Sequence, residues 1–163
     1  MSDPLATYLH DHLGGAKAAI ELLEAMRDHQ EDKPLGDFAA YLLAEIKADR
    51  DTLQLLAEKV GSGPNVIKEL TGWLGEKAAR LKLKPHSASA FEVFEALEFV
   101  ALGVRGKLGM WQALNVAATD DPRLSGYDFT QLAARAETQY QEVEQQRMQT
   151  AKIALAPPKG SNS

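Results

Sequence analysis

The stretch YLHDHLGGAKAAIELLEAM, residues 8–26, repeats its apolar side chains at alternating steps of four and three. That spacing is typical of an α-helix with one buried face. Ser2 or Asp3 as the cap and Pro4 as the first residue form a characteristic helix start. The sequence therefore predicts a long first helix, whose inward face consists of Leu5, Leu9, His12, Ala16, Ala19, Leu23 and Met26.

The same spacing predicts four further helices along the chain. Asp128 and Gln131 form a capping-box pattern at the start of the last one. No segment alternates apolar and polar residues with period two, so no strand is expected. The chain is predicted to be all-α, with long helices over about 35–60, 88–118 and 128–155 and a shorter helix over about 64–82.

The lengths of the connections select a topology for these helices. A short loop near residues 30–34 makes the first two long helices an antiparallel hairpin, and residues 119–127 join the last two in the same way. About two dozen residues separate the hairpins, enough to cross the full length of the bundle. Helix lengths and connectivity up to about residue 155 resemble the ferritin-like bundles, which implies an up-down bundle of four long helices with a short extra helix in the crossover.

The composition limits the class of protein. A chain of 163 residues suits one domain, predicted over 1–155, followed by a flexible tail over 156–163. A formal net charge of −5 argues against binding nucleic acid. The absence of cysteine excludes disulfides and thiolate metal sites. No signal peptide or membrane span is expected, so a cytoplasmic location is predicted.

The resemblance implies a site for iron or manganese, built from one glutamate on each of two helices and a Glu-x-x-His motif on each of the other two. The histidine of that motif is missing at every candidate glutamate, since Ala48 follows Glu45, Tyr140 follows Glu137 and Arg147 follows Glu144 at that spacing. We therefore expect no cofactor. A divergent metal or ligand site would use His12, Glu45, Asp49 and Glu98.

The positions of these residues along the bundle axis indicate a different role for their charged side chains. Counting residues from each hairpin loop places the metal candidates at one level with basic residues. Charges on apolar stripes need partners, and pairs of Glu98 with Arg147, and of Asp49 with Arg105 or His12, would supply them. The sequence thus favours a structural ion-pair layer containing Arg105, Glu144 and Arg147.

Glycines cluster at the same depth. Gly103 and Gly106 belong to the segment GVRGKLG, and Gly14 and Gly15 lie level with them. A glycine inside a helix lowers the stability of the helix by up to ~1 kcal/mol relative to alanine. The presence of glycine at these positions therefore requires an explanation. Close packing between helices is the first interpretation. A small-ligand cavity, or a glycine face used for dimer contact, is the alternative.

No catalytic constellation is apparent, which favours a non-enzymatic bundle with a structural or stress-related role. A divergent metal-binding oxidoreductase or metal-storage protein, and a bundle that binds a small ligand, are the alternatives. The mostly polar final helix has a narrow apolar stripe, which suits a helix at the edge of the bundle or one covered by a second subunit, and we expect a homodimer.

Overall fold

The computed structural model describes residues 3–29, 33–61 and 88–160, and all regular structure in these ranges is helical. The all-α prediction is confirmed with four long helices, and their ends lie within two residues of the predicted ones. The predicted short helix over 64–82 lies outside the described residues. The elements are α1 (Pro4–His29), α2 (Pro34–Val60), α4 (Ala90–Ala117), the single-turn 3₁₀ helix η1 (Pro122–Leu124) and α5 (Phe129–Ala154).

Side-chain caps mark the starts of α1, α4 and α5, whereas α2 begins at Pro34 without one. Asp3 Oδ1 accepts a hydrogen bond from Leu5 N at 3.0 Å, and Asp128 Oδ1 accepts one from Gln131 N at 2.9 Å. The complete capping box is at α4, where Ser89 Oγ accepts from Glu92 N and Glu92 Oε2 accepts from Ser89 N. The predicted box at α5 is therefore present only as its Asp128 half.

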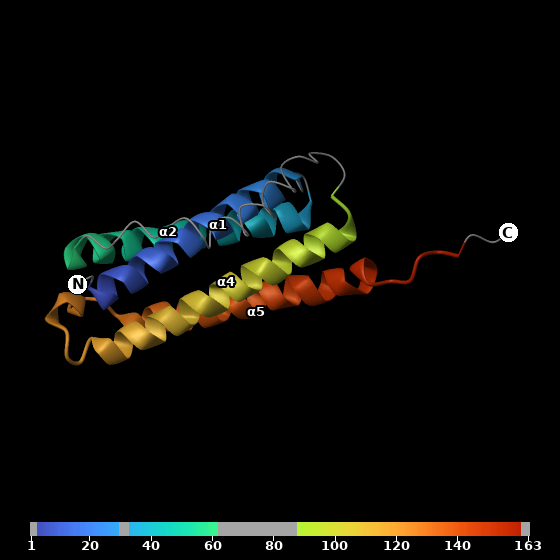
Figure 1. Ribbon diagram of the computed structural model, residues 1–163. Coiled ribbons are helices and arrows are strands. Elements are labelled where there is room, and N and C mark those ends of the chain that lie inside the picture. The colour runs from blue at the N-terminus through green and yellow to red at the C-terminus, as the bar shows by residue number, and fades with distance from the viewer. Residues whose placement is uncertain (1–2, 30–32, 62–87, 161–163) are drawn as a thin grey trace.

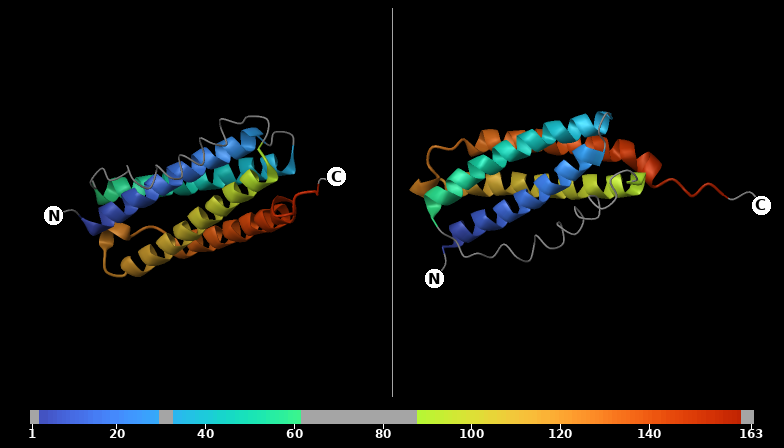
Figure 2. Two further views of the ribbon diagram at one scale, coloured as in Figure 1. Left: turned by 45° about the vertical axis from the view of Figure 1, so that its right-hand side comes forward. Right: turned by 90° about the horizontal axis from the view of Figure 1, so that it is seen from above.

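The helices form two antiparallel hairpins. α1 packs along α2, and α4 packs along α5 more closely than any other pair (Figure 1). α2 and α4 run in the same direction, so the end of α2 and the start of α4 lie at opposite ends of the bundle (Figures 1 and 2). Between the hairpins, α1 makes more contacts with α4 than α2 makes with α5. None of the described helices combines the length and the apolar run that crossing a bilayer requires.

The apolar core is divided into two clusters along the bundle axis. One contains Leu23, Leu42 and Leu97, towards the loop between α1 and α2. The other contains Leu9, Trp111 and Phe129, towards η1. On α2 the first cluster ends at Ile46 and the second begins at Leu53, and on α5 the break lies between Ala136 and Val143. On α4 the clusters meet at Val104 and Leu108, one turn apart. The middle of the bundle is therefore the level at which polar groups enter the interior.

Candidate functional site

Five polar side chains occupy the break between the two apolar clusters, and we refer to them as the polar layer. α2 supplies Glu45 and Asp49, α4 supplies Lys107, and α5 supplies Arg135 and Gln139. Asp49 and Gln139 are each only 2% exposed. Each lies at the point on its helix where the apolar seam would otherwise continue.

The polar layer is connected by hydrogen bonds and ion pairs. Lys107 Nζ donates to Asp49 Oδ2 and to Gln139 Oε1. Gln139 Nε2 donates to Glu45 Oε2 and to Asp49 Oδ2, each at 3.2 Å. Arg135 Nη2 donates to Glu45 Oε2 at 3.2 Å and lies 3.3 Å from Asp49 Oδ1. Two carboxylates thus face two basic groups, and their formal charges cancel.

Burial is uneven across this layer. The side chains of Lys107 and Asp49 are 14% and 3% exposed, whereas those of Arg135 and Glu45 are 40% and 33% exposed. Burial lowers the pKa of Lys107, and the neighbouring Asp49 carboxylate opposes that shift. The ammonium form of Lys107 is therefore maintained by its contact with Asp49, because the apolar surroundings disfavour an isolated charge.

The expected partners of Asp49 differ from the observed ones. Arg105 is exposed and instead pairs with Glu137 at 3.4 Å, with its guanidinium over the ring of Tyr140. His12 packs edge-on against Tyr8, with the ring centroids 4.7 Å apart. The reason is rotational, since Arg105 and Lys107 lie on opposite sides of α4.

The expected pair of Glu98 and Arg147 is present at 2.9 Å, and Arg147 also pairs with Glu144 at 2.7 Å. These three residues, which we call the surface triad, lie away from the polar layer. The side chain of Glu98 is 49% exposed. The single layer expected from helix depths is therefore two separate groups, and only the polar layer contains fully buried polar side chains, those of Asp49 and Gln139.

Sequence reasoning missed Lys107, Arg135 and Gln139. A signal was available for two of them. Lys107 stands three residues after Val104 and four before Trp111, and Gln139 stands three after Ala136 and four before Val143. Both positions continue the helical period of buried residues, which marks these polar side chains as facing inward. Arg135 has no comparable pattern in the sequence.

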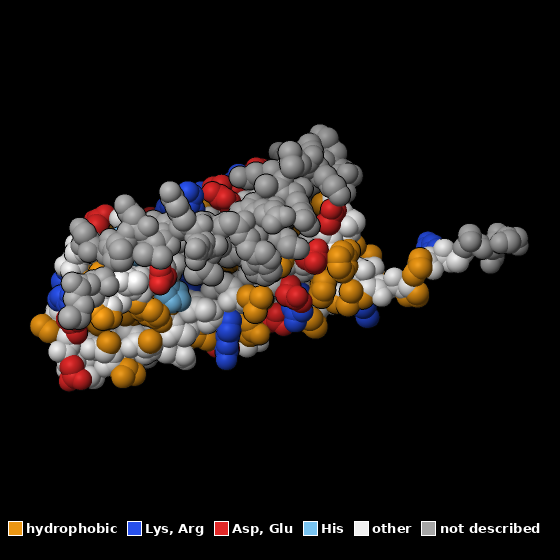
Figure 3. All heavy atoms as spheres, viewed as in Figure 1, with side chains coloured by type: hydrophobic (Ala, Val, Ile, Leu, Met, Phe, Trp, Pro, Cys, Tyr) orange, Lys and Arg blue, Asp and Glu red, His pale blue; other side chains and the backbone are white. Residues whose placement is uncertain are grey.

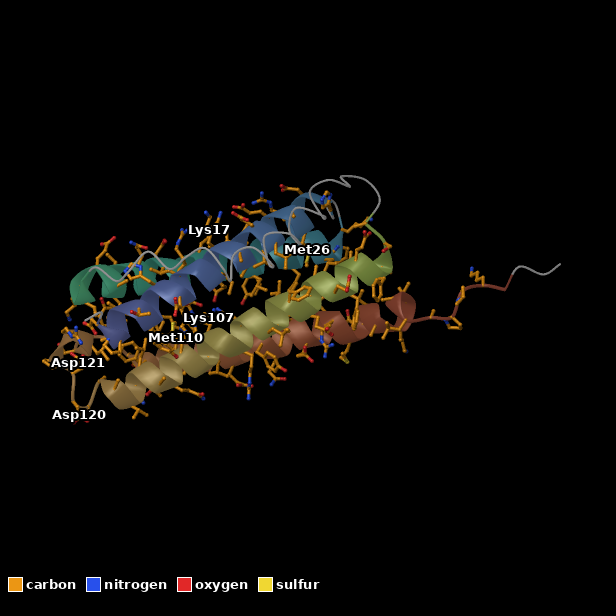
Figure 4. The ribbon with its side chains drawn as sticks, viewed as in Figure 1. Lys17, Met26, Lys107, Met110, Asp120 and Asp121 are labelled. Atoms are coloured by element: carbon orange, nitrogen blue, oxygen red, sulfur yellow. The ribbon has the colours of Figure 1, made fainter. Side chains whose placement is uncertain are left out.

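A cavity of about 330 Å³ lies beside the polar layer, among α1, α2 and α4. Figure 4 shows Lys107 and Met110 on neighbouring turns of α4, on the side towards α1. Asp49 and Lys107 contribute to the wall, as do Asp11, His12 and Arg50. Most of the remaining lining is apolar: Ala16, Ala19, Leu22, Ile46, Leu53, Phe99, Val100, Leu102, Val104, Met110 and Trp111.

The glycines of the middle level belong to this cavity. Gly15, Gly103 and Gly106 line it, and a Cβ built on any of them meets no atom of the described residues within 4 Å. The described residues therefore show no close packing against these three glycines, and the close-packing interpretation of their spacing stays a prediction. Gly14 is buried in α1 and does not line the cavity.

The metal candidates do not fit a di-iron centre. Glu45 and Asp49 are engaged by Lys107 and Arg135, and Glu98 is engaged by Arg147. Within the described ranges, no three potential histidine, aspartate or glutamate ligands are grouped so as to hold a metal ion. A cation entering the layer would have to displace a lysine or an arginine from each carboxylate.

His12 lines the cavity from α1, whereas Asp49 and Lys107 of the polar layer line it from α2 and α4. Burial lowers its pKa, against the opposing effect of the neighbouring Asp11 carboxylate. A lowered pKa favours the neutral imidazole near pH 7. His12 therefore adds a polar group to the cavity without adding a charge.

No family model, curated protein or solved structure matches this chain. The functional interpretation therefore depends on the geometry of the polar layer and of the cavity.

Proposed function

We propose that this protein is a non-catalytic helical bundle that binds a small, mostly apolar molecule in the cavity among α1, α2 and α4. The observation that carries the proposal is the cavity itself, at about 330 Å³ and lined mainly by apolar side chains. Ligand sites in proteins are concave, mostly apolar and equipped with a few placed polar groups. Side chains at three glycine positions would narrow the space, and their absence leaves it open.

The polar layer has a structural role in this proposal. It places charges of both signs at one depth on three helices, which ties α2 to both helices of the second hairpin. Buried polar residues can set the register between helices in this way. A metal-dependent oxidoreductase or a metal-storage protein, the alternative from the sequence, would need free carboxylates where these are paired.

We also propose that the bundle belongs to the ferritin-like class. Two antiparallel hairpins with parallel α2 and α4 support that class.

The proposal includes a homodimer. Met148 and Ile153 on α5 and Leu155 at its end are exposed apolar side chains, which supports contact with a second subunit there. On the face in Figure 3, apolar side chains are interspersed with charged ones. Light scattering tests the dimer, which should give twice the 17.8 kDa of one chain.

Titration with the neutral fluorophore N-phenyl-1-naphthylamine tests ligand binding. We expect saturable binding to the wild type with one molecule per chain. Gly106→Leu and Gly15→Leu, which place a side chain at the cavity wall, should weaken binding about tenfold or more.

Gly109→Leu is the matched control, because Gly109 is on the same helix and has open space around its Cβ but does not line the cavity. It should bind as the wild type does. Absence of saturable binding to the wild type, or equal binding by all four proteins, would overturn the proposal.

A further inference from the structure

We infer that the ligand of this cavity is an uncharged, unbranched aliphatic molecule with one oxygen atom that accepts a hydrogen bond from Lys107. This inference rests on the proposed function and names its ligand class. Three features carry it, namely the shape of the cavity, the charge balance of its wall and an unused donor on Lys107.

The cavity is long. On α4 its lining runs from Phe99 to Trp111, a distance of ~18 Å at 1.5 Å per residue. On α1 it runs from Asp11 to Leu22, nearly the same length along the bundle axis. The length of this lining along the bundle axis suits an extended chain.

The wall next to the polar layer has no net charge to offer a ligand. Asp49 and Glu45 are balanced by Lys107 and Arg135. A ligand carboxylate at Lys107 would also lie beside Asp49, and a ligand ammonium at Asp49 would also lie beside Lys107, so either would lose its hydration without meeting a net opposite charge.

The other charged groups of the wall do not change that balance. Arg50 is paired with Asp51 at 2.8 Å, and Asp11 is exposed to solvent. His12 has its pKa lowered by burial. None of them provides an unpaired buried charge that would favour a charged ligand.

Lys107 has one donor left for a ligand. A lysine ammonium carries three N–H groups. Two of the three in Lys107 donate hydrogen bonds, one to Asp49 and one to Gln139. No described residue accepts the third. Because the side chain is only 14% exposed and lines the cavity, a neutral oxygen of a bound alcohol, aldehyde or ketone would supply the missing acceptor.

A charge series of equal chain length tests the inference on the wild-type protein. Decan-1-ol, decanoate and decylamine compete with N-phenyl-1-naphthylamine at pH 7.5, where the second is an anion and the third a cation. Decanol should displace the fluorophore at a concentration at least about tenfold lower than either charged compound. If decanoate or decylamine competes as well as decanol, the inference is overturned while the proposed function stands.

If the fluorophore binds and none of the three compounds displaces it, the aliphatic ligand class is overturned. If the fluorophore itself does not bind, the proposed function fails instead. These outcomes distinguish a failure of the inferred ligand class from a failure of the proposed function.

The double variant Asp49→Asn with Lys107→Met tests the role of Lys107, because it removes the donor and keeps the layer neutral. We expect decanol binding to weaken about five- to tenfold more than fluorophore binding does, because only decanol accepts a hydrogen bond from Lys107. Decanol binding that weakens no more than fluorophore binding would overturn the Lys107 contact. The charge series needs no variant, so the ligand class stays testable even if the double variant does not fold.

Discussion

Asp49 and Glu98 each pair with a basic residue from another helix of the bundle, yet they occupy opposite environments. The Asp49 side chain is 3% exposed and lies between two apolar clusters, whereas that of Glu98 is 49% exposed. Ion pairs at the surface contribute about 0–1 kcal/mol. Breaking a buried pair by removing one partner costs about 3–5 kcal/mol. Burial, more than the presence of a partner, distinguishes Asp49 from Glu98.

The largest expected effect is that of Lys107→Met. It leaves Asp49 as a buried carboxylate without its ammonium partner, so the free energy of unfolding should fall by about 3–5 kcal/mol. Urea denaturation followed by circular dichroism measures the change. The companion variant Asp49→Leu with Lys107→Met removes both charges and should recover most of the loss. A single variant as stable as the wild type would contradict the buried pair.

A smaller effect of opposite sign is expected at Gly106, one residue before Lys107 on α4. Since a Cβ at this position meets no described atom, Gly106→Ala should gain helix propensity without a clash. The free energy of unfolding should rise by up to ~1 kcal/mol, seen as a higher melting temperature. A lower melting temperature would support the interpretation of Gly106 as a close-packing residue.

The surface triad provides the direct comparison with the polar layer. Glu98→Gln removes one carboxylate from Arg147, which keeps its second contact with Glu144. The loss of stability should be at most ~1 kcal/mol and should shrink in high salt. Urea denaturation at two salt concentrations measures it. A loss as large as that of Lys107→Met would remove the distinction between the two groups.

The smallest expected effect is the pH dependence due to His12. Burial lowers its pKa in the folded state, so below pH ~6.5 the unfolded chain binds a proton more readily and stability falls as pH falls. The variant His12→Gln should show a smaller loss of stability between pH 7 and pH 5. Thermal unfolding across that range measures the difference.

The control is His10→Gln on the same helix, which should keep the wild-type pH dependence. Arginine neighbours lower the pKa values of three carboxyls, those of Asp3, Asp121 and Glu144. These carboxyls therefore titrate below this pH range. If His12→Gln and the wild type lose the same stability between pH 7 and pH 5, the imidazole of His12 is not the group responsible.

Much of the fold was predictable because its signals are local. Helix ends depend on caps such as Asp3 and Asp128, which lie within three residues of the groups they bind. The pair of Glu98 and Arg147 was also predictable, because both lie within one hairpin whose short loop fixes their relative depth. Contacts between the two hairpins were harder to predict from the sequence, because no short loop fixes the depth and rotation of one hairpin relative to the other.

The sequence by itself determined the long helices, their antiparallel pairing within each hairpin and the concentration of charge and glycine at mid-length. Only the tertiary structure decided which charges are buried. Arg105 and Lys107 differ by two residues, ~3 Å of rise and about 200° of rotation around α4. That rotation places Lys107 against Asp49 and leaves Arg105 outside. The cavity likewise depends on how α1 and α4 cross, because its walls come from residues far apart in the chain.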